Sequence, residues 1–413
     1  MESANDGHAY KQMWKSPVLS HLWANRAHGY DSMMRALIVE DGYSRGALSA
    51  ARALGSAGWA VGVGAGRRGL AASSRWTTYN HRVPAPYEDP VGFIEEINRA
   101  AVKIGYDVVF GAGDAEILAL SRGRSELKVR VPYPSHEAVV RALDKLELAR
   151  AAERAGLDSP LTVEPNGGDL GLELPVIVKA RLHSPPGSIG GLGRIEAAVV
   201  TTREAAVARV ARIVGLGARP IVQELIPGRL MALIVLREPE GKIVSCVQQV
   251  AERTWPDSAG ISVRATTVPV DDVLREKVAA LLDDLGWFGL AELQFVLSDA
   301  GGAWLIDLNG RFYGSLALAI GSGPDVASQW AAIAAGSPRE TISEAATGIR
   351  YQWLEGDLRR AFEERRGGLI KDIAGCLRYA RGATHSIWNP DDRWPAIRYV
   401  FELGWRGARK IVT

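Results

Sequence analysis

The stretch "LIDLNGRFYGSLALAIGSG", residues 305–323, decides how this chain folds. An apolar strand ends here in an acid, an amide and an arginine: Asp307, Asn309 and Arg311. One residue separates each from the next. Because side chains along a strand alternate between its two faces, these three project from one face and the apolar residues between them from the other. The sequence therefore predicts a polar row at the end of a strand.

The preceding residues supply a partner for this strand. The segment "GLAELQFVLSDAGGAWLIDLN" predicts a hairpin, with Gly301 and Gly302 taking positive φ at its turn. Glu292 and Gln294 form a second polar row on the first strand, and the hairpin lets the two rows meet. Oxygen ligands of this kind suit magnesium, and an arginine can bind a phosphoryl group or a carboxylate in forked geometry. The alternative is an exposed polar strand face with a salt bridge.

Composition narrows the class of protein. A chain of 413 residues predicts two or three domains, and 47% apolar with 23% charged residues is typical of soluble globular proteins. The net charge of +2 gives no general attraction to nucleic acid. Two distant cysteines, Cys246 and Cys376, argue against a disulfide framework or a zinc site and favour a cytoplasmic location. Cys246, within an apolar strand, is expected in the core. No apolar stretch reaches the length of a membrane span.

The first third of the chain alternates strands and helices. Residues 1–34 contain no apolar block of signal-peptide type, so we expect a disordered leader, or translation starting at Met33 or Met34. In residues 35–134, strands such as "ALIV" and "VVF" precede helical segments, which predicts a parallel sheet with helices on both faces. "GAGRRG", residues 64–69, matches the dinucleotide fingerprint but follows the second strand and opens no clear helix. We favour a glycine-rich turn and keep a dinucleotide oxidoreductase as an alternative.

Helices and strands continue to alternate through the middle of the chain. Helices are predicted from Ser135, as N-cap, to Gly156, over Thr202–Val214 and over Asp271–Leu285. The end of the chain is helical, rich in arginine, and contains Trp388, Trp394 and Trp405. Such a segment could touch a membrane surface or a partner. Because Pro and Asp residues interrupt its apolar stripe, we expect its aromatic side chains to pack onto the parent domain instead.

The opening stretch resembles the "EINxRFxGSL" end of the nucleotide site in ATP-grasp ligases, particularly carboxylate–amine ligases related to carbamoyl-phosphate synthase. Four further segments resemble motifs of that family in the same order: "ALDKLELARAAERAG", "PVIVKARLHSPPGSIGG", "IVQELIPG" and "GWFGLAELQF". The resemblance implies an α/β ATP-grasp fold. Its parts would be an N-terminal parallel α/β domain (35–134), a small lid subdomain with its preceding helix (135–220), a large subdomain (221–345) and a helical, basic C-terminal extension (346–413).

The resemblance also implies the residues that bind ATP, which are Lys145, Lys179, Gly190, Gly191, Gln223, Glu224 and Ile226. The two lysines would lie along the phosphates, and the glycines would let backbone amides approach phosphate oxygens. Gln223, Glu224 and the Ile226 amide would bind the adenine, and strand alternation favours Gln223 pointing inward. Lys179 follows the apolar run "LPVIV", where an unpaired charge would be costly.

By the same resemblance, Gln294, Asp307 and Asn309 would hold Mg²⁺ or Mn²⁺, and Asn309 and Arg311 would act in catalysis. Arg253 and Arg264 would bind the substrate, with surface arginines as the alternative. Two positions depart from the family pattern. Asp307 stands where glutamate is usual, and Gly310 replaces a common proline. Replacing Asn309 or Arg311 by alanine is expected to stop turnover and leave the fold intact.

The implied activity is that of an ATP-dependent ligase. It would activate a carboxylate as an acyl phosphate and join it to an amine, releasing ADP and phosphate, with no protein nucleophile. Its partners would be small-molecule carboxylates and amines and no nucleic acid, and family habit suggests a homodimer. The alternative is an ATP-binding regulatory or scaffold protein with a degenerate ATP-grasp site.

Overall fold

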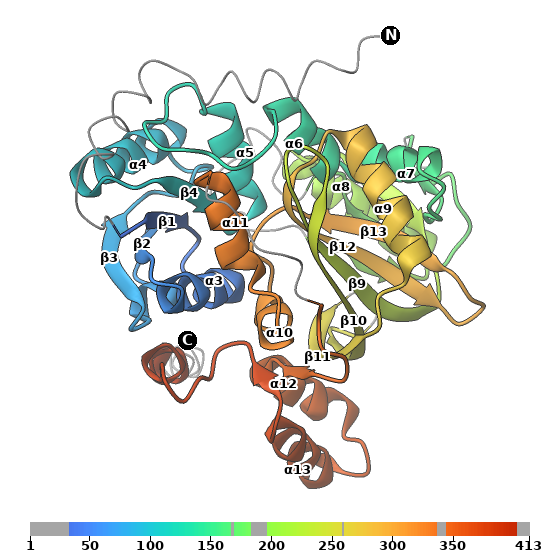
Figure 1. The fold of residues 1–413 in the computed structure, drawn as a ribbon. Coiled ribbons are helices and arrows are strands. Elements are labelled where there is room, and N and C mark those ends of the chain that lie inside the picture. The colour runs from blue at the N-terminus through green and yellow to red at the C-terminus, as the bar shows by residue number, and fades with distance from the viewer. Residues whose placement is uncertain (1–32, 167–168, 183–195, 258–259, 337–343, 403–413) are drawn as a thin grey trace.

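The computed structural model describes residues 33–166, 169–182, 196–257, 260–336 and 344–402 (Figure 1). Nearly all of the expected leader, together with Trp405, lies outside these ranges. Within the described ranges, no helix combines the length and apolar composition that crossing a bilayer requires.

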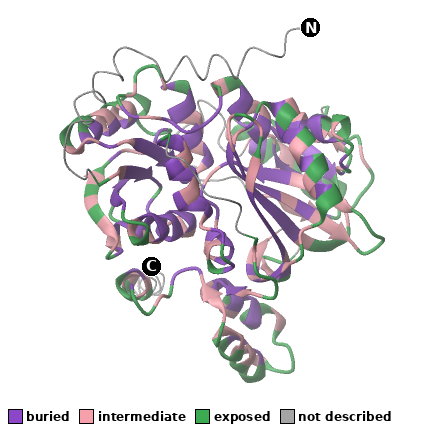
Figure 2. Ribbon diagram, viewed as in Figure 1, coloured by how far each residue is buried: buried purple, intermediate pink, exposed green. Residues whose placement is uncertain are grey.

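The first sheet is parallel and four-stranded, with its strands in the order β3-β2-β1-β4. The strands are β1 (Arg35–Val39), β2 (Ala60–Ala65), β3 (Thr77–Arg82) and β4 (Val108–Gly111). The helical elements of this part are α3 (Arg45–Ser56), η1 (Ala71–Ser73), α4 (Pro90–Ile104) and α5 (Asp114–Arg122). Strands β1, β2 and β4 are buried almost throughout (Figure 2), as their continuous apolar runs require. The predicted parallel α/β sheet is confirmed. "GAGRRG" lies at the end of β2 and in the turn after it, as the turn interpretation predicts.

The largest sheet has seven strands in the order β13-β12-β9-β10-β11-β14-β15. Its strands are β9 (Gly228–Arg237), β10 (Ile243–Trp255), β11 (Ile261–Val268), β12 (Gly289–Ser298), β13 (Ala303–Asn309), β14 (Arg350–Gln352) and β15 (Thr384–His385). Its helices are α9 (Asp272–Leu285), α10 (Leu316–Gly321) and α11 (Val326–Ala334). Residues of this sheet and of the parallel sheet belong to one hydrophobic core, which fixes their relative positions. Cys246 is buried in β10, as expected.

The third sheet is small and antiparallel, in the order β5-β8-β6-β7. It consists of β5 (Thr162–Val163), β6 (Val176–Ala180), β7 (Ala198–Val200) and β8 (Pro220–Glu224), covered by α8 (Arg203–Gly215). The side chain of Thr202 caps α8, and the predicted helix is confirmed. This unit has a separate small apolar core, which is the arrangement expected of a subdomain that packs on its own.

The helix predicted from Ser135 to Gly156 is two helices, α6 (His136–Leu143) and α7 (Lys145–Arg154). Ser135 caps the first of them as predicted, by accepting a hydrogen bond from the Ala138 amide. The break is at Asp144, whose backbone is extended and whose carboxylate caps α7. Arg181 also donates two hydrogen bonds to this carboxylate. The continuous helix was wrong because a cap and a distant ion pair override helical propensity at this position.

The C-terminal extension contains α12 (Leu354–Glu364) and α13 (Leu369–Ala380). The expected packing of its aromatic side chains is wrong for Trp388 and Trp394, whose exposed fractions are 48% and 67%. The segment is held by Ile387 and Tyr399, which pack on the main core, and by Asp392, which accepts hydrogen bonds from Arg52 Nε at 2.9 Å and from Ser74 Oγ at 2.7 Å. The anchor uses the inward side of the segment and leaves the tryptophans outside.

Candidate active site

The predicted hairpin is present, and its two polar rows lie directly across from one another. Glu292 of β12 pairs with Asn309 of β13, and Gln294 pairs with Asp307. At the turn, Gly301 and Gly302 have φ of 100° and 84°, as predicted. Because all four polar residues are buried or half-buried, the solvated strand face considered from the sequence does not describe this hairpin.

Glu292 is at the centre of a hydrogen-bond network at the end of the hairpin. Its carboxylate accepts hydrogen bonds from Asn309 Nδ2 at 2.8 Å, Gln294 Nε2 at 3.2 Å and Ser315 Oγ at 3.4 Å. Burial raises the pKa of Glu292 to about 7, although the Arg311 charge and the amide donors act in the opposite direction. A buried carboxyl with this pKa can gain or lose a proton near neutral pH, and it favours a cation beside it.

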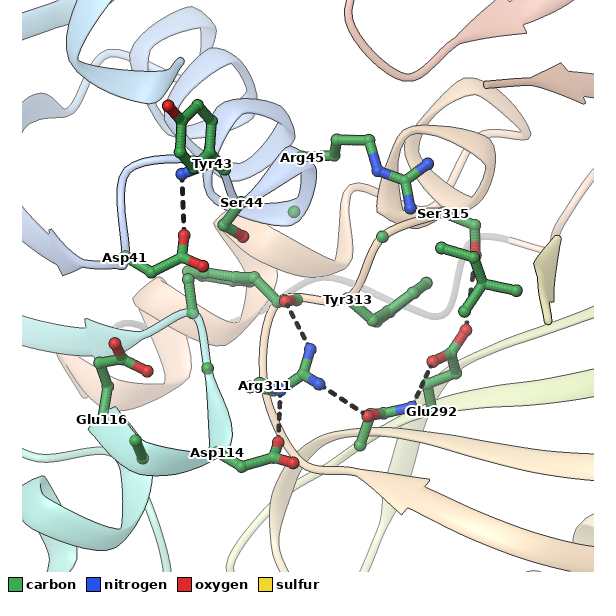
Figure 3. Close-up of a pocket in the computed structure, with 18 of the residues that line it drawn as sticks. Asp41, Tyr43, Ser44, Arg45, Asp114, Glu116, Glu292, Arg311, Tyr313 and Ser315 are labelled. Carbon is green, nitrogen blue, oxygen red and sulfur yellow. Dashed lines mark hydrogen bonds and ion pairs between the residues drawn. The ribbon is translucent and has the colours of Figure 1, made fainter. Parts of the chain in front are cut away.

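Arg311 joins the hairpin to the parallel α/β part. Its Nε donates to Asp114 Oδ1 at 2.5 Å, and a terminal nitrogen donates to Asn309 Oδ1 at 2.9 Å (Figure 3). Asp114 opens α5, directly after β4, so the ion pair links two segments far apart in sequence. Both side chains are almost fully buried. Removing this arginine would leave the buried carboxylate of Asp114 without its ion-pair partner. We therefore expect Arg311→Ala to destabilise the fold, rather than to leave it intact.

The two predicted lysines converge on β13 from separate elements. Lys145, the first residue of α7, has its Nζ 3.4 Å from Asp307 Oδ1. Lys179 of β6 donates from Nζ to the Ile306 carbonyl oxygen at 3.2 Å. Their exposed fractions are only 3% and 6%, so neither is a solvated surface charge. Two buried ammonium groups that contact one strand, one of them paired with a carboxylate, form a cationic site for an anionic ligand such as a phosphate chain.

The predicted adenine-binding strand has the orientation that alternation favoured. Gln223 of β8 is buried, and its Nε2 donates to Thr162 Oγ1 at 2.8 Å while its Oε1 has no partner among the described residues. Glu224 is exposed and accepts a hydrogen bond from the Leu161 amide, and Ile226 is half-buried. Gln223 is therefore the member of this set with an unsatisfied buried acceptor.

Two pairs of predicted site residues remain, two glycines and two arginines. Gly190 and Gly191 lie outside the described residues. Arg253 and Arg264 point into the C-terminal extension, where Arg253 is paired with Asp357 and Asp372 at 3.0 Å each, and Arg264 with Asp357 at 2.7 Å. Neither arginine lines the candidate cavity described next, because the acidic residues of α12 and α13 bind their guanidinium groups.

A cavity of about 320 Å³ lies between the hairpin end and the parallel sheet (Figure 3). Predicted residues that line it are Gln294, Asn309 and Arg311. Six lining residues that sequence reasoning did not assign to the site are Asp41, Arg45, Asp114, Glu116, Tyr313 and Ser315. Acidic residues directly after the first and fourth parallel strands were the available signal, since ligands of open parallel sheets bind at the carboxyl ends of the strands.

Magnesium fits the donor set of the hairpin. Two carboxylates, Glu292 and Asp307, and two amides, Gln294 and Asn309, occupy facing positions on adjacent strands. In the part of the chain that the structure describes, no three acidic, histidine or cysteine side chains are grouped as a metal site would require, so an ion here would depend on amide oxygens or on ligand oxygens. Glu292 would then bind the ion with the oxygens that now accept hydrogen bonds from the amide N–H groups.

No protein-family profile matches the chain, and no curated protein matches it in sequence. Solved structures do match it. N5-carboxyaminoimidazole synthetase from Staphylococcus aureus has a TM-score of 0.61 and 14% identity, covering 81% of this chain and 87% of that one. The biotin carboxylase domain dimer of Hydrogenobacter thermophilus 2-oxoglutarate carboxylase, in complex with MgADP, ADP and bicarbonate, has a TM-score of 0.58 and 15% identity, covering 78% and 74%.

An L-amino acid ligase from Bacillus licheniformis is similar to the same degree, with a TM-score of 0.57, 14% identity, and coverage of 74% of this chain and 75% of that one. At identities this low, the structural match shows a shared fold. The fold they share is the one that the five sequence motifs predict, and this chain therefore has the ATP-grasp fold.

Proposed function

We propose that this protein is an ATP-dependent, ADP-forming ligase that activates a carboxylate as an acyl phosphate and joins it to an amine. The observation that carries the proposal is the convergence of Lys145 and Lys179 on β13, where they contact Asp307 and the Ile306 carbonyl oxygen, on the strand that ends at Asn309, to which Arg311 donates a hydrogen bond. Buried cations along one strand and oxygen donors at its end are what a magnesium-bound triphosphate needs.

The described residues divide into three roles in this proposal. Lys145 and Lys179 bind phosphate oxygens, and Gln223 uses its unpartnered Oε1 to accept a hydrogen bond from the adenine amino group. Gln294, Asp307 and Asn309, joined by Glu292, would hold a magnesium ion, which when bound neutralises charge on the phosphoryl groups. Arg311 stabilises the negative charge of the transferred group, held in place by Asp114 and Asn309.

The proposed reaction needs no protein nucleophile, because the substrates supply both attacking groups. An oxygen of the substrate carboxylate attacks the γ-phosphorus, the bond to the β-phosphate oxygen breaks, and ADP leaves. The amine then attacks the acyl carbon, phosphate leaves, and the amine loses a proton. Both described cysteines are buried, and burial raises the pKa of each thiol, which fits a mechanism that does not use a thiolate.

The solved structures support this proposal at the level of reaction class. Their descriptions name a synthetase, a carboxylase domain bound to MgADP and an L-amino acid ligase. A dimer is described for the second of these, and a homodimer is proposed for the present chain on that basis.

Product analysis tests the proposal. The full chain is incubated with Mg-ATP and pooled carboxylates and amines, and nucleotides are separated by ion-exchange chromatography. We expect ADP and phosphate in equal amounts, and their loss in Asn309→Ala. AMP and pyrophosphate would rule out the acyl-phosphate route, and tight ATP binding without turnover would favour the regulatory or scaffold alternative.

A further inference from the structure

The cavity lies at the topological switch point of the parallel sheet. Strand β1 has β2 on one side and β4 on the other, so the connections after β1 and β4 leave in opposite directions. Such a division opens a crevice at the carboxyl ends of the two strands, where ligands of open α/β sheets bind. Residues 41–46 after β1 and 112–116 after β4 line this wall of the cavity, opposite the hairpin.

This wall carries a cluster of acidic side chains. Asp41 follows β1, and Asp114 and Glu116 lie in the first turn of α5. Asp114 is neutralised by Arg311. Asp41 and Glu116 form no side-chain ion pair among the described residues, although both line the cavity (Figure 3). Burial raises the pKa of Glu116 to about 7, although the Arg311 charge lowers it, and Arg67 donates from Nε to the Asp41 carbonyl oxygen at 3.4 Å. Two acidic side chains on the side of the cavity that faces the hairpin therefore lack an ion-pair partner among those residues.

Glu116 points to a ligand more strongly than an exposed acid would. Its exposed fraction is only 5%, and within the described ranges no other residue donates a hydrogen bond to its carboxylate. It lies over Gly113, where an added Cβ would come within 2.2 Å of Glu116 Oε2. Glu40, the residue before Asp41, is equally buried, and its Oε1 has no hydrogen-bond partner among those residues, whereas its Oε2 accepts from the Ser44 amide at 2.9 Å. Burying unpaired carboxylates is costly, and a ligand cation would offset that cost.

The remaining cation of the cavity does not neutralise this wall. Arg45, the first residue of α3, stacks on Trp353 with its guanidinium carbon 3.9 Å from the ring centroid, and donates to Tyr351 Oη at 3.3 Å. A metal ion is a poor occupant, because no three acidic, histidine or cysteine side chains of the described ranges are grouped as an all-protein site needs. An ammonium or guanidinium group suits two carboxylates better, since it brings several N–H donors at once.

We propose that the amine substrate carries a second, non-reacting cationic group, as a diamine or a basic amino acid does, and that Asp41 and Glu116 bind that group. The inference rests on the proposed function, because the reacting amine would lie across the cavity, towards Asn309 and Arg311. Asp41 and Glu116 thereby select among amines by charge, and have no part in phosphoryl transfer.

The test measures binding, so that it does not depend on knowing the carboxylate substrate. Isothermal titration calorimetry on the full chain with MgADP compares three matched pairs: 1,5-diaminopentane with n-pentylamine, L-lysine with L-norleucine, and L-arginine with L-citrulline. We expect the member with the additional cationic group to bind about tenfold more tightly in at least one pair, the size of one charge-assisted hydrogen bond. Glu116→Gln and Asp41→Asn should each remove most of this preference, whereas Glu95→Gln, an exposed acid of α4, should retain it.

Equal binding within all three pairs, no binding of any cation at millimolar concentration, or a preference undiminished in both variants would overturn the inference. Glu116→Gln keeps the size of the side chain, and its circular dichroism spectrum and unfolding midpoint confirm that it folds. The proposed function fails separately, by absence of MgADP binding. In that event the same amine titrations on the nucleotide-free protein decide the inference.

Discussion

Arg311 is the residue on which both walls of the cavity depend. Its guanidinium bonds Asp114 on one side and Asn309 on the other, and both it and Asp114 are almost fully buried. Breaking a buried ion pair leaves an uncompensated charge and costs far more than breaking a surface pair. The same side chain positions the walls and, in the proposed function, binds the transferred group, so its removal tests stability and activity together.

Arg311→Met should lower the free energy of unfolding by about 3 kcal/mol, because Asp114 stays buried without a cation. Arg311→Met/Asp114→Asn should recover part of that loss, since the stranded charge is gone. Urea unfolding followed by circular dichroism measures both. Arg150→Met, which breaks an exposed pair with Glu147, should cost less than about 0.5 kcal/mol. A loss in Arg311→Met no larger than in this control would contradict the structural role.

Glu40 gives stability a dependence on pH. Burial, and then the neighbouring charges of Asp41 and Glu116, raise its pKa from 4.5 to about 8, against hydrogen bonds from the Ser44 and Gly42 amides. Between these values the folded chain holds a proton that the unfolded chain loses, so this group makes stability fall as pH rises from about 4.5 to about 8. The unfolding temperature of Glu40→Gln relative to the native chain should therefore be higher at pH 8.5 than at pH 5, by calorimetry. If the variant and the native chain differ in unfolding temperature by the same amount at both pH values, as expected for Glu95→Gln, Glu40 is not the source of the pH dependence.

At the scale of elements, the break between α6 and α7 positions the first lysine. Asp144 caps α7 by accepting hydrogen bonds from the Leu146 and Glu147 amides, and it binds Arg181 of the segment after β6. Lys145 is the next residue, so the cap fixes the start of the helix from which its Nζ reaches Asp307. A single carboxylate thus ties the helix, the small sheet and the lysine together.

Asp144→Ala should raise the KM for ATP by about tenfold, because losing the cap and ion pair, together worth about 1–3 kcal/mol, frees Lys145 to move. Asp144→Asn keeps a capping oxygen and should have a smaller effect. Asp271→Ala removes the cap of α9, away from the cavity, and should cost about 1 kcal/mol of stability without changing this KM. Initial rates measured at varied ATP concentration give the KM of each variant. Similar KM values in Asp144→Ala and Asp271→Ala would show that the cap serves stability alone.

The turn after β13 is set by a close contact with a buried ring. Gly310 lies between Asn309 and Arg311, and a Cβ there would come within 2.1 Å of Trp287 Cη2. Trp287 is fully buried, so its ring cannot move aside cheaply. This contact explains why the proline common in ATP-grasp ligases is absent, since any side chain at this position would overlap the indole.

Gly310→Ala should therefore cost about 2 kcal/mol of stability and reduce kcat by moving Arg311. Trp287→Phe makes room for the added methyl group. The double variant should therefore lose less stability than the two single variants lose together, by at least about 1 kcal/mol. Unfolding free energies of the four proteins form the cycle. Strictly additive costs would mean that the ring does not determine the choice of glycine.

At the scale of the whole molecule, the sheet architecture and the local features of the fold were predictable, and the long-range contacts between charged side chains were not. The hairpin turn, the cap at Ser135 and the helices starting near Thr202 and Asp271 were predicted because each depends on residues a few positions apart. The split at Asp144 was missed because Arg181, which holds that carboxylate, comes 37 residues later. Propensity alone favoured one continuous helix.

The candidate site divides in the same way. Hairpin residues were predicted from their spacing, and the motif resemblance added the lysines and Gln223. The acidic wall was missed because Asp114 meets Arg311 across 197 residues, through chain topology that spacing does not encode. Arg253 was assigned to the substrate by resemblance, and nothing in its neighbourhood indicates Asp357, which pairs with it from 104 residues away. The role of a charged residue near a site in sequence cannot be assigned until its ion-pair partners are known.

The transfer of carboxylate oxygen to phosphate tests the central claim most directly. The full chain is incubated with Mg-ATP, an amine pool and carboxylates labelled with ¹⁸O, and the released phosphate is examined by mass spectrometry. An acyl phosphate leaves one carboxylate oxygen on the phosphate, so the account predicts one ¹⁸O per phosphate released, and no release in Asn309→Ala. Phosphate released without ¹⁸O would show that the carboxylate never attacks the γ-phosphorus and would contradict the account.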